Sequence, residues 1–375
     1  MAFDATPLLG RPTGVGAFCI GALDGLARLA EVDVSAYAVS WRRRHVIGSL
    51  VPSGVSVRQH AMPARPLHPL WGRSSLPPVE WFIGRHDVVH GTNFVVPPTS
   101  HASRVVTVHD LTVILYPQLC DVSSLAYPGL IRRAVAGGAW IHTPSQFVAD
   151  QVIEEFDVDP DRVRAVHHGI AHLDGPGDPD AALPFNLPVG CQRFVLAIGT
   201  IEPRKDYPSL VEAFSSIAST YHDLALVIVG ADGWGVEAYE DAVRSSSVAS
   251  RIVRPGYLSD AELAVTLGRA TMLAYPSVYE GFGFPPLQAM AAGIPVVTTV
   301  AGAVPEVVGG GALLVEPGDP DSLAGAMETI LVGGRDVELL VERGRQRSAA
   351  FSWDNCAGGL ADLYRDAIAY DRRHR

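Results

Sequence analysis

TMLAYPSVYEGFGFPPLQAMAAGIPVVTT, the stretch Thr271–Thr299, is the part of the sequence that decides the fold. Its apolar run Met272–Tyr275 predicts a short buried strand, and residues 287–292 predict a helix that Gly293 ends with a left-handed cap. The β-branched run Val296–Thr299 predicts the next strand. A strand, a loop, a helix and a second strand in this order are typical of a parallel α/β sheet.

The loop inside this stretch holds Glu280, Gly281 and Gly283 and follows the carboxyl end of a strand, where open α/β sheets bind ligands. Glycines let backbone N–H groups approach a ligand closely, and a helix N-terminus favours negative charge or hydroxyl oxygens. The Glu280 carboxylate adds an acceptor among these donors, and Gln288 on the helix reaches the same crevice. The arrangement suits the binding of a polyol, with a generic tight turn as the alternative.

Residues 279–290, YEGFGFPPLQAM, resemble the signature of retaining GT-B glycosyltransferases, the family-four group that includes many bacterial mannosyltransferases. That signature has two glutamates separated by seven residues: the first contacts the donor sugar, and the second holds the ribose of the sugar nucleotide. Here Glu280 stands at the first position, but Gln288 stands at the second. The resemblance implies that the loop residues next to Glu280 also bind the donor: Gly281, Phe282 and Gly283.

Two other segments extend the resemblance. Residues 199–206, GTIEPRKD, resemble the family's Gly-x-x-x-x-x-Lys loop, which begins here at Gly199. Arg204 and Lys205 are adjacent cations at a predicted helix entry, and we expect them to clamp the donor diphosphate, with an exposed surface pair as the alternative. The strand VVTVHDL resembles the family segment whose histidine lies beside the donor sugar, which implies that role for His109. A core histidine bonded to the backbone is the alternative.

Two weaker matches complete the predicted site. The segment before the helix at 259–270 resembles the part of the family fold that lies against the nucleobase, so Tyr257 is expected to form a wall of the base pocket or to pack on the helix. Near the N-terminus, Gly14–Gly16 predicts a glycine-rich turn between a strand at 2–6 and a helix. By resemblance, Gly16 in this turn faces the donor.

Composition limits the class of protein. The chain has 375 residues, 48% of them apolar and 18% charged, which indicates a globular protein of two domains. Its net charge of −11 argues against a nucleic-acid binder. The four scattered cysteines suggest reduced thiols, and neither a signal peptide nor a membrane-spanning run is recognisable. We therefore expect a cytoplasmic protein. The cluster Trp41–His45 predicts a solvated surface or, alternatively, a peripheral contact at the inner face of the membrane.

The order of the predicted elements defines the domains. Residues 171–190 are dense in Gly, Pro and Asp and predict a linker between an acceptor-side domain at 1–170 and a sugar-nucleotide domain at 191–350. The resemblance implies an α/β fold of the GT-B type, in which two Rossmann-like domains face each other across a cleft. It also implies that a terminal helix in 351–375 crosses back onto the first domain. The proline-rich residues 63–78 predict an irregular connection.

The function implied by the resemblance is the transfer of a hexose, with retention of configuration, from a sugar nucleotide to a hydroxyl acceptor. GDP-mannose is the first expectation for the donor, and a glycan, a lipid-linked molecule or a small molecule is expected as the acceptor. No cofactor is expected. Because no Asp-x-Asp triplet lies at a strand end and two cations are at hand, we expect no metal either. The alternatives are a sugar-nucleotide epimerase or phosphorylase of the same fold and, because of Gln288, a non-catalytic sugar-nucleotide-binding protein.

Overall fold

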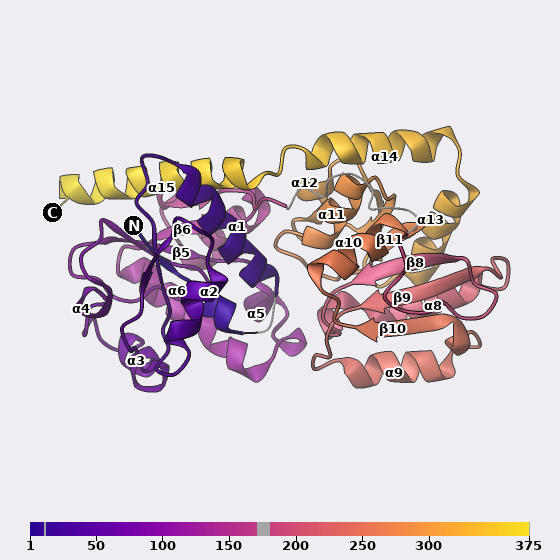
Figure 1. The fold of residues 1–375 in the computed structure, drawn as a ribbon, viewed down its shortest axis with the longest axis horizontal. Helices are drawn as coiled ribbons and strands as arrows, with labels where there is room; N and C mark the ends of the chain where they lie inside the picture. Colours follow the sequence, from indigo (N-terminus) through magenta and orange to yellow (C-terminus); the bar gives the residue numbers. More distant parts are fainter. Residues whose placement is uncertain (11–12, 171–180, 375) are drawn as a thin grey trace. The chain divides into compact units, whose positions relative to one another are not determined.

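A computed structural model of the chain describes residues 1–10, 13–170 and 181–374. The chain divides into two compact units: unit 1 comprises Met1–Ala171 and Phe351–Arg375, and unit 2 comprises His172–Ala350. Each unit is built around one parallel sheet (Figure 1), so the predicted α/β class with two Rossmann-like units is confirmed. Ten residues of the predicted linker lie outside the described residues, and 181–190 belong to unit 2.

The sheet of unit 1 has the strand order β3-β2-β1-β4-β5-β6-β7, and all its pairs are parallel. The order runs outward from β1 on one side and restarts at β4 on the other, so the junction of β1 and β4 is a topological switch point. The strands are β1 (Ala2–Asp4), β2 (Ser35–Tyr37), β3 (Ser56–Arg58), β4 (Val88–Gly91), β5 (Ser103–Thr107), β6 (Trp140–Thr143) and β7 (Val163–Ala165).

Helices accompany this sheet, and one of them comes from the end of the chain. The terminal helix α15 packs along α1, where a Cβ at Gly21 would collide with the Trp353 ring, so only glycine permits this approach. Arg28 on α1 also pairs with Asp354 at 2.6 Å. The helices of unit 1 are α1 (Gly14–Arg28), α2 (Ile47–Leu50), α3 (Ala64–Trp71), α4 (Glu80–Ile83), α5 (Thr112–Leu115), α6 (Tyr127–Ala136), α7 (Gln146–Phe156) and α15 (Trp353–His374).

Unit 2 repeats the same topology with the strand order β10-β9-β8-β11-β12-β13, again with parallel pairs. Its switch point lies between β8 and β11. The strands predicted at Met272–Tyr275 and Val296–Thr299 are confirmed as β11 and β12. The other strands are β8 (Arg193–Ile198), β9 (Leu224–Val229), β10 (Ile252–Gly256) and β13 (Leu313–Val315).

The helices of unit 2 follow local capping rules. Ser259 and Glu262 form a reciprocal capping box at the start of α10, and Gly293 ends α11 in the left-handed conformation at φ 74°. Helix α11 begins at Phe284, three residues before the predicted segment. The helices are α8 (Tyr207–Ile217), α9 (Val236–Ser245), α10 (Asp260–Gly268), α11 (Phe284–Ala292), α12 (Val304–Val308), α13 (Pro320–Val332) and α14 (Arg335–Ser348).

Two local predictions in unit 1 are wrong. Residues 63–78 are not wholly irregular, because α3 buries Leu67 and Trp71, four residues apart, and this apolar face outweighs the helix-breaking effect of Pro69. Gly14–Gly16 is not a turn but the first turn of α1, because the Thr13 side chain caps the helix by accepting a hydrogen bond from the Gly16 N–H at 3.4 Å.

Candidate functional site

The loops that follow β8 and β11 meet at the switch point of unit 2. Lys205 lies in the first loop and Glu280 in the second, 75 positions apart, and the Lys205 Nζ donates to Glu280 Oε1 at 2.5 Å. Arg204 Nη1 pairs with the other oxygen, Glu280 Oε2, at 2.6 Å. The fold therefore brings together three residues that the sequence analysis assigned to the donor site. No motif in the sequence predicted that these three side chains contact one another.

Two further side chains, which the sequence analysis did not assign to the site, complete this group. Glu202 Oε1 accepts from Arg204 Nη2 at 2.6 Å, and the Tyr275 hydroxyl lies 2.7 Å from Lys205 Nζ and 2.8 Å from Glu280 Oε1. We call Glu202, Arg204, Lys205, Tyr275 and Glu280 the switch-point cluster. No sequence pattern singles out Tyr275, because aromatic residues are common in β-strands.

The charges of the switch-point cluster balance inside the protein. Glu280 and Lys205 are only 7% and 8% exposed. Burial alone would raise the pKa of Glu280, but the charges of Arg204 and Lys205 outweigh burial and lower that pKa to about 2. Two carboxylates therefore neutralise two cations. The cations predicted to clamp a diphosphate are not free; an incoming anion has to compete with Glu280 for them.

Lys205 is the only lysine in the sequence; the remainder of the 29 Lys and Arg residues are arginine. Its ammonium has three N–H donors, of which Glu280 and Tyr275 take two, and the described part of the chain offers no partner for the third. Gly199 makes room for this side chain: its φ is +152°, and a Cβ there would lie 3.2 Å from Lys205 Cε. Gly199 thus shapes the predicted site by supporting Lys205.

The loop before α11 offers fewer N–H donors than the sequence suggested. Gly283 adopts φ +109° as the residue before the helix. Since α11 begins at Phe284, Pro285 and Pro286 occupy its second and third positions and provide no N–H. Phe282, the other loop residue predicted to bind the donor, is 5% exposed and packs its ring 5.2 Å from that of Phe284. The contribution of this helix N-terminus to anion binding therefore rests mainly on its dipole.

The remaining predicted residues of unit 2 are more exposed. Gln288 lies in the second turn of α11 and is half-buried, and its side-chain amide makes no hydrogen bond within the described residues. Tyr257 directly follows β10, the edge strand of the sheet, and is 55% exposed. Strand β10 is two places from β8 in the sheet, so Tyr257 stands apart from the switch-point cluster while remaining at the same edge.

Gly302 is a supporting residue that the sequence analysis missed. It follows β12 with φ +59°, and a Cβ there would collide with the backbone oxygen of Glu280 and lie 2.9 Å from its nitrogen. The next residue, Ala303, donates its N–H to that same Glu280 oxygen at 2.8 Å. The loop after β12 therefore holds the backbone of Glu280 in place. A glycine in a sequence gives no sign of such a contact.

In unit 1, His109 lies just beyond the carboxyl end of β5. Its Nε2 lies 2.8 Å from the backbone oxygen of Thr92 and must carry the hydrogen, because a carbonyl only accepts. Burial lowers the pKa of His109, so the ring is neutral and Nδ1 is an acceptor. The rings of Phe18 and Phe94 pack around it. Gly16 is buried in α1, and its N–H already donates to the side chain of Thr13, which caps that helix.

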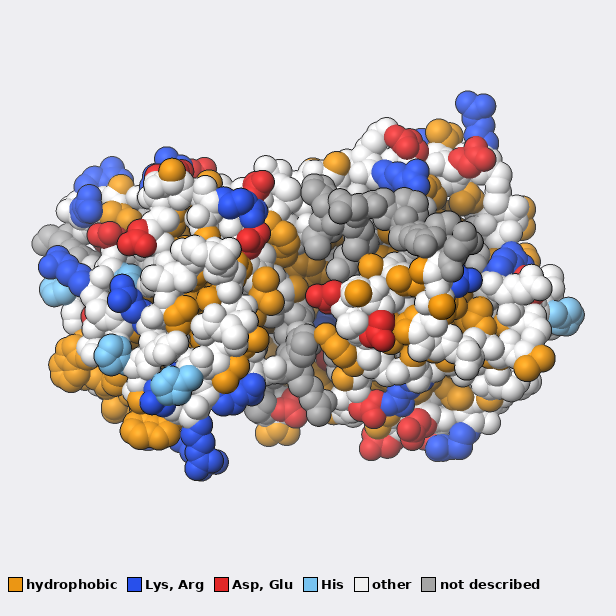
Figure 2. Space-filling view, in the orientation of Figure 1, with side chains coloured by type: hydrophobic (Ala, Val, Ile, Leu, Met, Phe, Trp, Pro, Cys, Tyr) orange, Lys and Arg blue, Asp and Glu red, His pale blue; other side chains and the backbone are white. Residues whose placement is uncertain are grey.

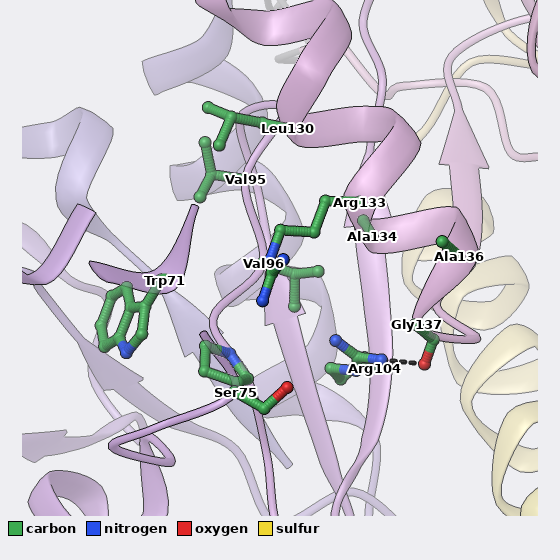
Figure 3. A pocket seen from close by; sticks show the side chains of 11 residues that line it. Trp71, Ser75, Val95, Val96, Arg104, Leu130, Arg133, Ala134, Ala136 and Gly137 are labelled. Carbon is green, nitrogen blue, oxygen red and sulfur yellow. Dashed lines mark hydrogen bonds between the residues drawn. The ribbon is translucent and has the colours of Figure 1, made fainter. Parts of the chain in front are cut away.

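Unit 1 also contains a cavity of about 370 Å³ that is not part of this site. Figure 3 shows it between the C-terminal half of α6 and Trp71, with Arg133 pointing into it and Arg104 donating to the Gly137 oxygen. Arg104 lies near the start of β5, whereas His109 follows the end of that strand. The cavity therefore lies near the start of β5 and not at the carboxyl end, where His109 is.

The basic cluster Trp41–His45 lies on the surface of unit 1. Trp41 is 59% exposed, while Arg43 and Arg44 donate to the backbone oxygens of Leu9 and Trp41. Figure 2 shows hydrophobic, basic and histidine side chains close together on the visible face of this unit. Across the described residues, no helix has the length and apolar character needed to span a membrane, and no group of three His, Cys, Asp or Glu side chains is arranged to hold a metal ion.

Comparison with known proteins identifies the family. Residues 184–347 match the family model described as Glycosyl transferases group 1, and residues 12–172 match Glycosyltransferase Family 4. The D-inositol 3-phosphate glycosyltransferase of Acidothermus cellulolyticus is 32% identical over 316 residues, which are 77% of this chain and 69% of that protein. The O-antigen chain mannosyltransferase B of Escherichia coli is 29% identical over 282 residues, 74% of each chain.

A solved structure supports the same fold over the whole chain. The sucrose-phosphate synthase of Thermosynechococcus elongatus superposes with a TM-score of 0.77 at 20% identity and covers 98% of this chain and 99% of its own. The two matched regions fall in the two units, one ending and the other beginning inside the predicted linker at 171–190. The chain therefore belongs to the family-four glycosyltransferases and is an enzyme of the GT-B fold.

Proposed function

We propose that this glycosyltransferase moves mannose from GDP-mannose to a hydroxyl of a glycan acceptor, with retention of configuration and without a metal ion. The observation that carries the proposal is the switch-point cluster of unit 2, which sets two cations and a carboxylate at the edge where α/β sheets bind ligands. The name of the Escherichia coli relative, an O-antigen chain mannosyltransferase, supports mannose as the sugar and a glycan as the acceptor.

The reaction breaks the bond between the sugar's anomeric carbon and the diphosphate, so negative charge builds up on the diphosphate. The third ammonium hydrogen of Lys205 and the guanidinium of Arg204 are donors for that charge, in a buried site where electrostatic stabilisation is strong. As the diphosphate takes the Arg204 guanidinium, Glu280 Oε2 becomes available to accept hydrogen bonds from sugar hydroxyls, while Oε1 stays with Lys205. The two cations fill the role that a metal has in other sugar-nucleotide enzymes.

We propose that the acceptor hydroxyl attacks the anomeric carbon from the face of the sugar that the diphosphate leaves. An oxygen of the departing phosphate takes the hydroxyl proton. His109 is proposed to contact the sugar and to accept a hydroxyl hydrogen at Nδ1, since Nε2 donates to the backbone oxygen of Thr92. Gln288 is proposed to meet the ribose, where its amide accepts from one hydroxyl and donates to the oxygen of the other. A glutamate would only accept.

The setting of the reaction is part of the same proposal. The enzyme is proposed to work in the cytoplasm or at the inner face of the membrane, where lipid-linked glycans would be within reach. The exposed Trp41 beside the exposed Arg42 supports a peripheral contact there, because an aromatic and a cation together suit a lipid interface.

Thermal unfolding in the presence of GDP-, UDP-, ADP- and dTDP-sugars tests the donor, because a bound ligand raises the melting temperature by mass action. Incubation of GDP-mannose with p-nitrophenyl α-mannoside, followed by mass spectrometry and proton NMR of the product, then tests transfer and retention. Hydrolysis of the donor, in which water takes the place of the acceptor hydroxyl, is a second readout that needs no sugar acceptor. Activity in excess EDTA is expected to be unchanged.

The controls separate the alternatives. Epimerised sugar nucleotide formed from the donor alone would identify an epimerase. Binding of the donor with neither transfer nor hydrolysis, in wild type and in Gln288→Glu alike, would identify a sugar-nucleotide-binding protein. Turnover by wild type and its loss in Lys205→Met supports the proposed transferase.

A further inference from the structure

The hydroxyl of Tyr275 is the one polar side-chain atom on β11. The strand consists of Met272, Leu273, Ala274 and Tyr275, and all four are buried, Tyr275 at 3% exposure. A phenylalanine would fill the space of the ring. A hydroxyl in a buried position costs free energy unless it is hydrogen-bonded, so its partners indicate what it does.

Those partners are the two oppositely charged groups of the switch-point cluster. The Lys205 ammonium donates to the Tyr275 oxygen at 2.7 Å, the Tyr275 hydroxyl donates to Glu280 Oε1 at 2.8 Å, and the same ammonium donates to Oε1 at 2.5 Å. An ammonium only donates and a carboxylate only accepts, so the direction of every bond in this ring of three is determined. Burial and then the charge of Glu280 raise the pKa of Tyr275, so the hydroxyl keeps its hydrogen.

The strand itself does not need this hydroxyl. The backbone of Tyr275 is held by its pairing with Thr298 on β12 and by the Thr298 hydroxyl, which donates to the backbone oxygen of Tyr275 at 2.9 Å. The centroid of the Tyr275 ring also lies 4.7 Å from Lys205 Nζ, within cation–π distance, and that contact needs only the ring. The hydroxyl therefore acts on the orientation of Lys205 and Glu280.

We propose that Tyr275 is a positioning residue whose hydroxyl holds the Lys205 ammonium and the Glu280 carboxylate so that the third ammonium hydrogen is presented to the diphosphate of the donor. The proposal rests on the proposed function for the identity of that anion. It also accounts for the presence of a lysine in a chain whose other cations are arginines. A compact ammonium closes a ring with one hydroxyl and one carboxylate oxygen, whereas the planar guanidinium of arginine spreads its donors apart.

The single lysine gives the proposal a direct spectroscopic test. Protein grown with ζ-¹⁵N-lysine contains one labelled ammonium, and its proton–nitrogen NMR signal reports Lys205 alone. In ligand-free wild type we expect a signal shifted from that of a solvated lysine and in slow exchange with water. Tyr275→Phe should move this signal toward the solvated position and speed up its exchange. The control is Tyr364→Phe in unit 1, which removes another buried hydroxyl, bonded to His90 at 2.7 Å, and should leave the signal unchanged.

Calorimetry with GDP as the probe adds the functional readout. Loss of one charge-assisted hydrogen bond should weaken GDP binding about ten-fold in Tyr275→Phe. Because the hydroxyl acts through the ammonium, Tyr275→Phe should have no further effect in a Lys205→Met background, which a double-mutant cycle detects. A residue that merely stabilises the fold would weaken binding equally in both backgrounds.

Each result decides the proposal. It is overturned by an unchanged ammonium signal in Tyr275→Phe, by additive effects in the cycle, or by a wild-type signal that already equals that of solvated lysine; the last measurement needs no variant. If GDP fails to bind wild type, the proposed donor is wrong. The comparison of ligand-free wild type with Tyr275→Phe still decides whether Tyr275 positions Lys205.

Discussion

Replacing Glu280 by glutamine should strengthen the binding of GDP while it abolishes turnover. In the switch-point cluster, Glu280 pairs with both Arg204 and Lys205, Glu202 pairs with Arg204, and the four charges cancel. The substitution removes one negative charge and leaves the cluster with a net charge of +1. The diphosphate then no longer competes with the Glu280 carboxylate for the two cations, so it binds more tightly. Turnover is abolished because the carboxylate proposed to contact the sugar is lost.

The size of the gain follows from Coulomb's law. For a phosphate charge roughly 6 Å from the lost carboxylate, at an effective dielectric constant of about 20, the relieved repulsion is about 3 kcal/mol. Screening by salt and by water at the partly open edge reduces this to roughly half, which corresponds to about ten-fold tighter GDP binding. Loss of one partner from a buried ion pair costs about 3 kcal/mol of folding stability, or roughly 6–12 °C in melting temperature for a domain of this size.

The assay is calorimetry with GDP and, separately, with GMP. GMP lacks the second phosphate and should gain less affinity than GDP. Melting temperatures are measured with and without GDP, and the stabilisation by GDP should be larger in the variant than in wild type. Glu202→Gln is the matched control. It also removes one negative charge from the cluster, but Glu202 contacts only one of the two cations, Arg204. GDP affinity that is unchanged or weaker in Glu280→Gln would refute competition between Glu280 and the diphosphate.

Other perturbations test the remaining parts of the site. Lys205→Met should lower kcat/KM by about 10²-fold or more through the loss of an electrostatic contact with the leaving group, and steady-state kinetics near the wild-type values would remove Lys205 from the mechanism. Because the pKa of Glu280 is lowered from about 4.5 to about 2 on folding, its stabilising contribution is complete above pH 4.5 and is lost as the pH falls toward 2; urea unfolding should show a steeper loss of stability in acid for wild type than for Glu280→Gln. Gln288→Glu should tighten GDP binding by up to about five-fold, or 1 kcal/mol, measured by calorimetry; recovery of activity from an inactive wild type would show that the natural protein does not catalyse transfer. Gly302→Ala should reduce both stability and turnover, because the new Cβ collides with the Glu280 backbone. Gly318→Ala is the control: its φ is +72° and its new Cβ would have no neighbouring atom within 4 Å, so it adds backbone strain alone and should keep its turnover.

The elements of unit 2 could be predicted well because their signals are local. Strands β11 and β12 have the predicted bounds, since short apolar or β-branched runs between turn residues are a sufficient signal for buried parallel strands. The site loops were also recognisable, because each follows the carboxyl end of a strand. The prediction was wrong where tertiary burial outweighed a local preference. The prolines of residues 63–78 predicted an irregular connection, but α3 forms around Pro69 because Leu67 and Trp71 are buried by the rest of unit 1.

The sequence by itself therefore determined the α/β class, the family resemblance and the presence of Arg204, Lys205 and Glu280 in loops at strand ends. Only the tertiary structure decided that these loops are neighbours, because the strand order places β8 beside β11 although Lys205 and Glu280 are 75 positions apart. The same pairing of strands brings the Tyr275 hydroxyl between the two charges and Gly302 against the Glu280 backbone. Contacts of this kind depend on distances between atoms, and residue type and spacing along the chain do not encode them.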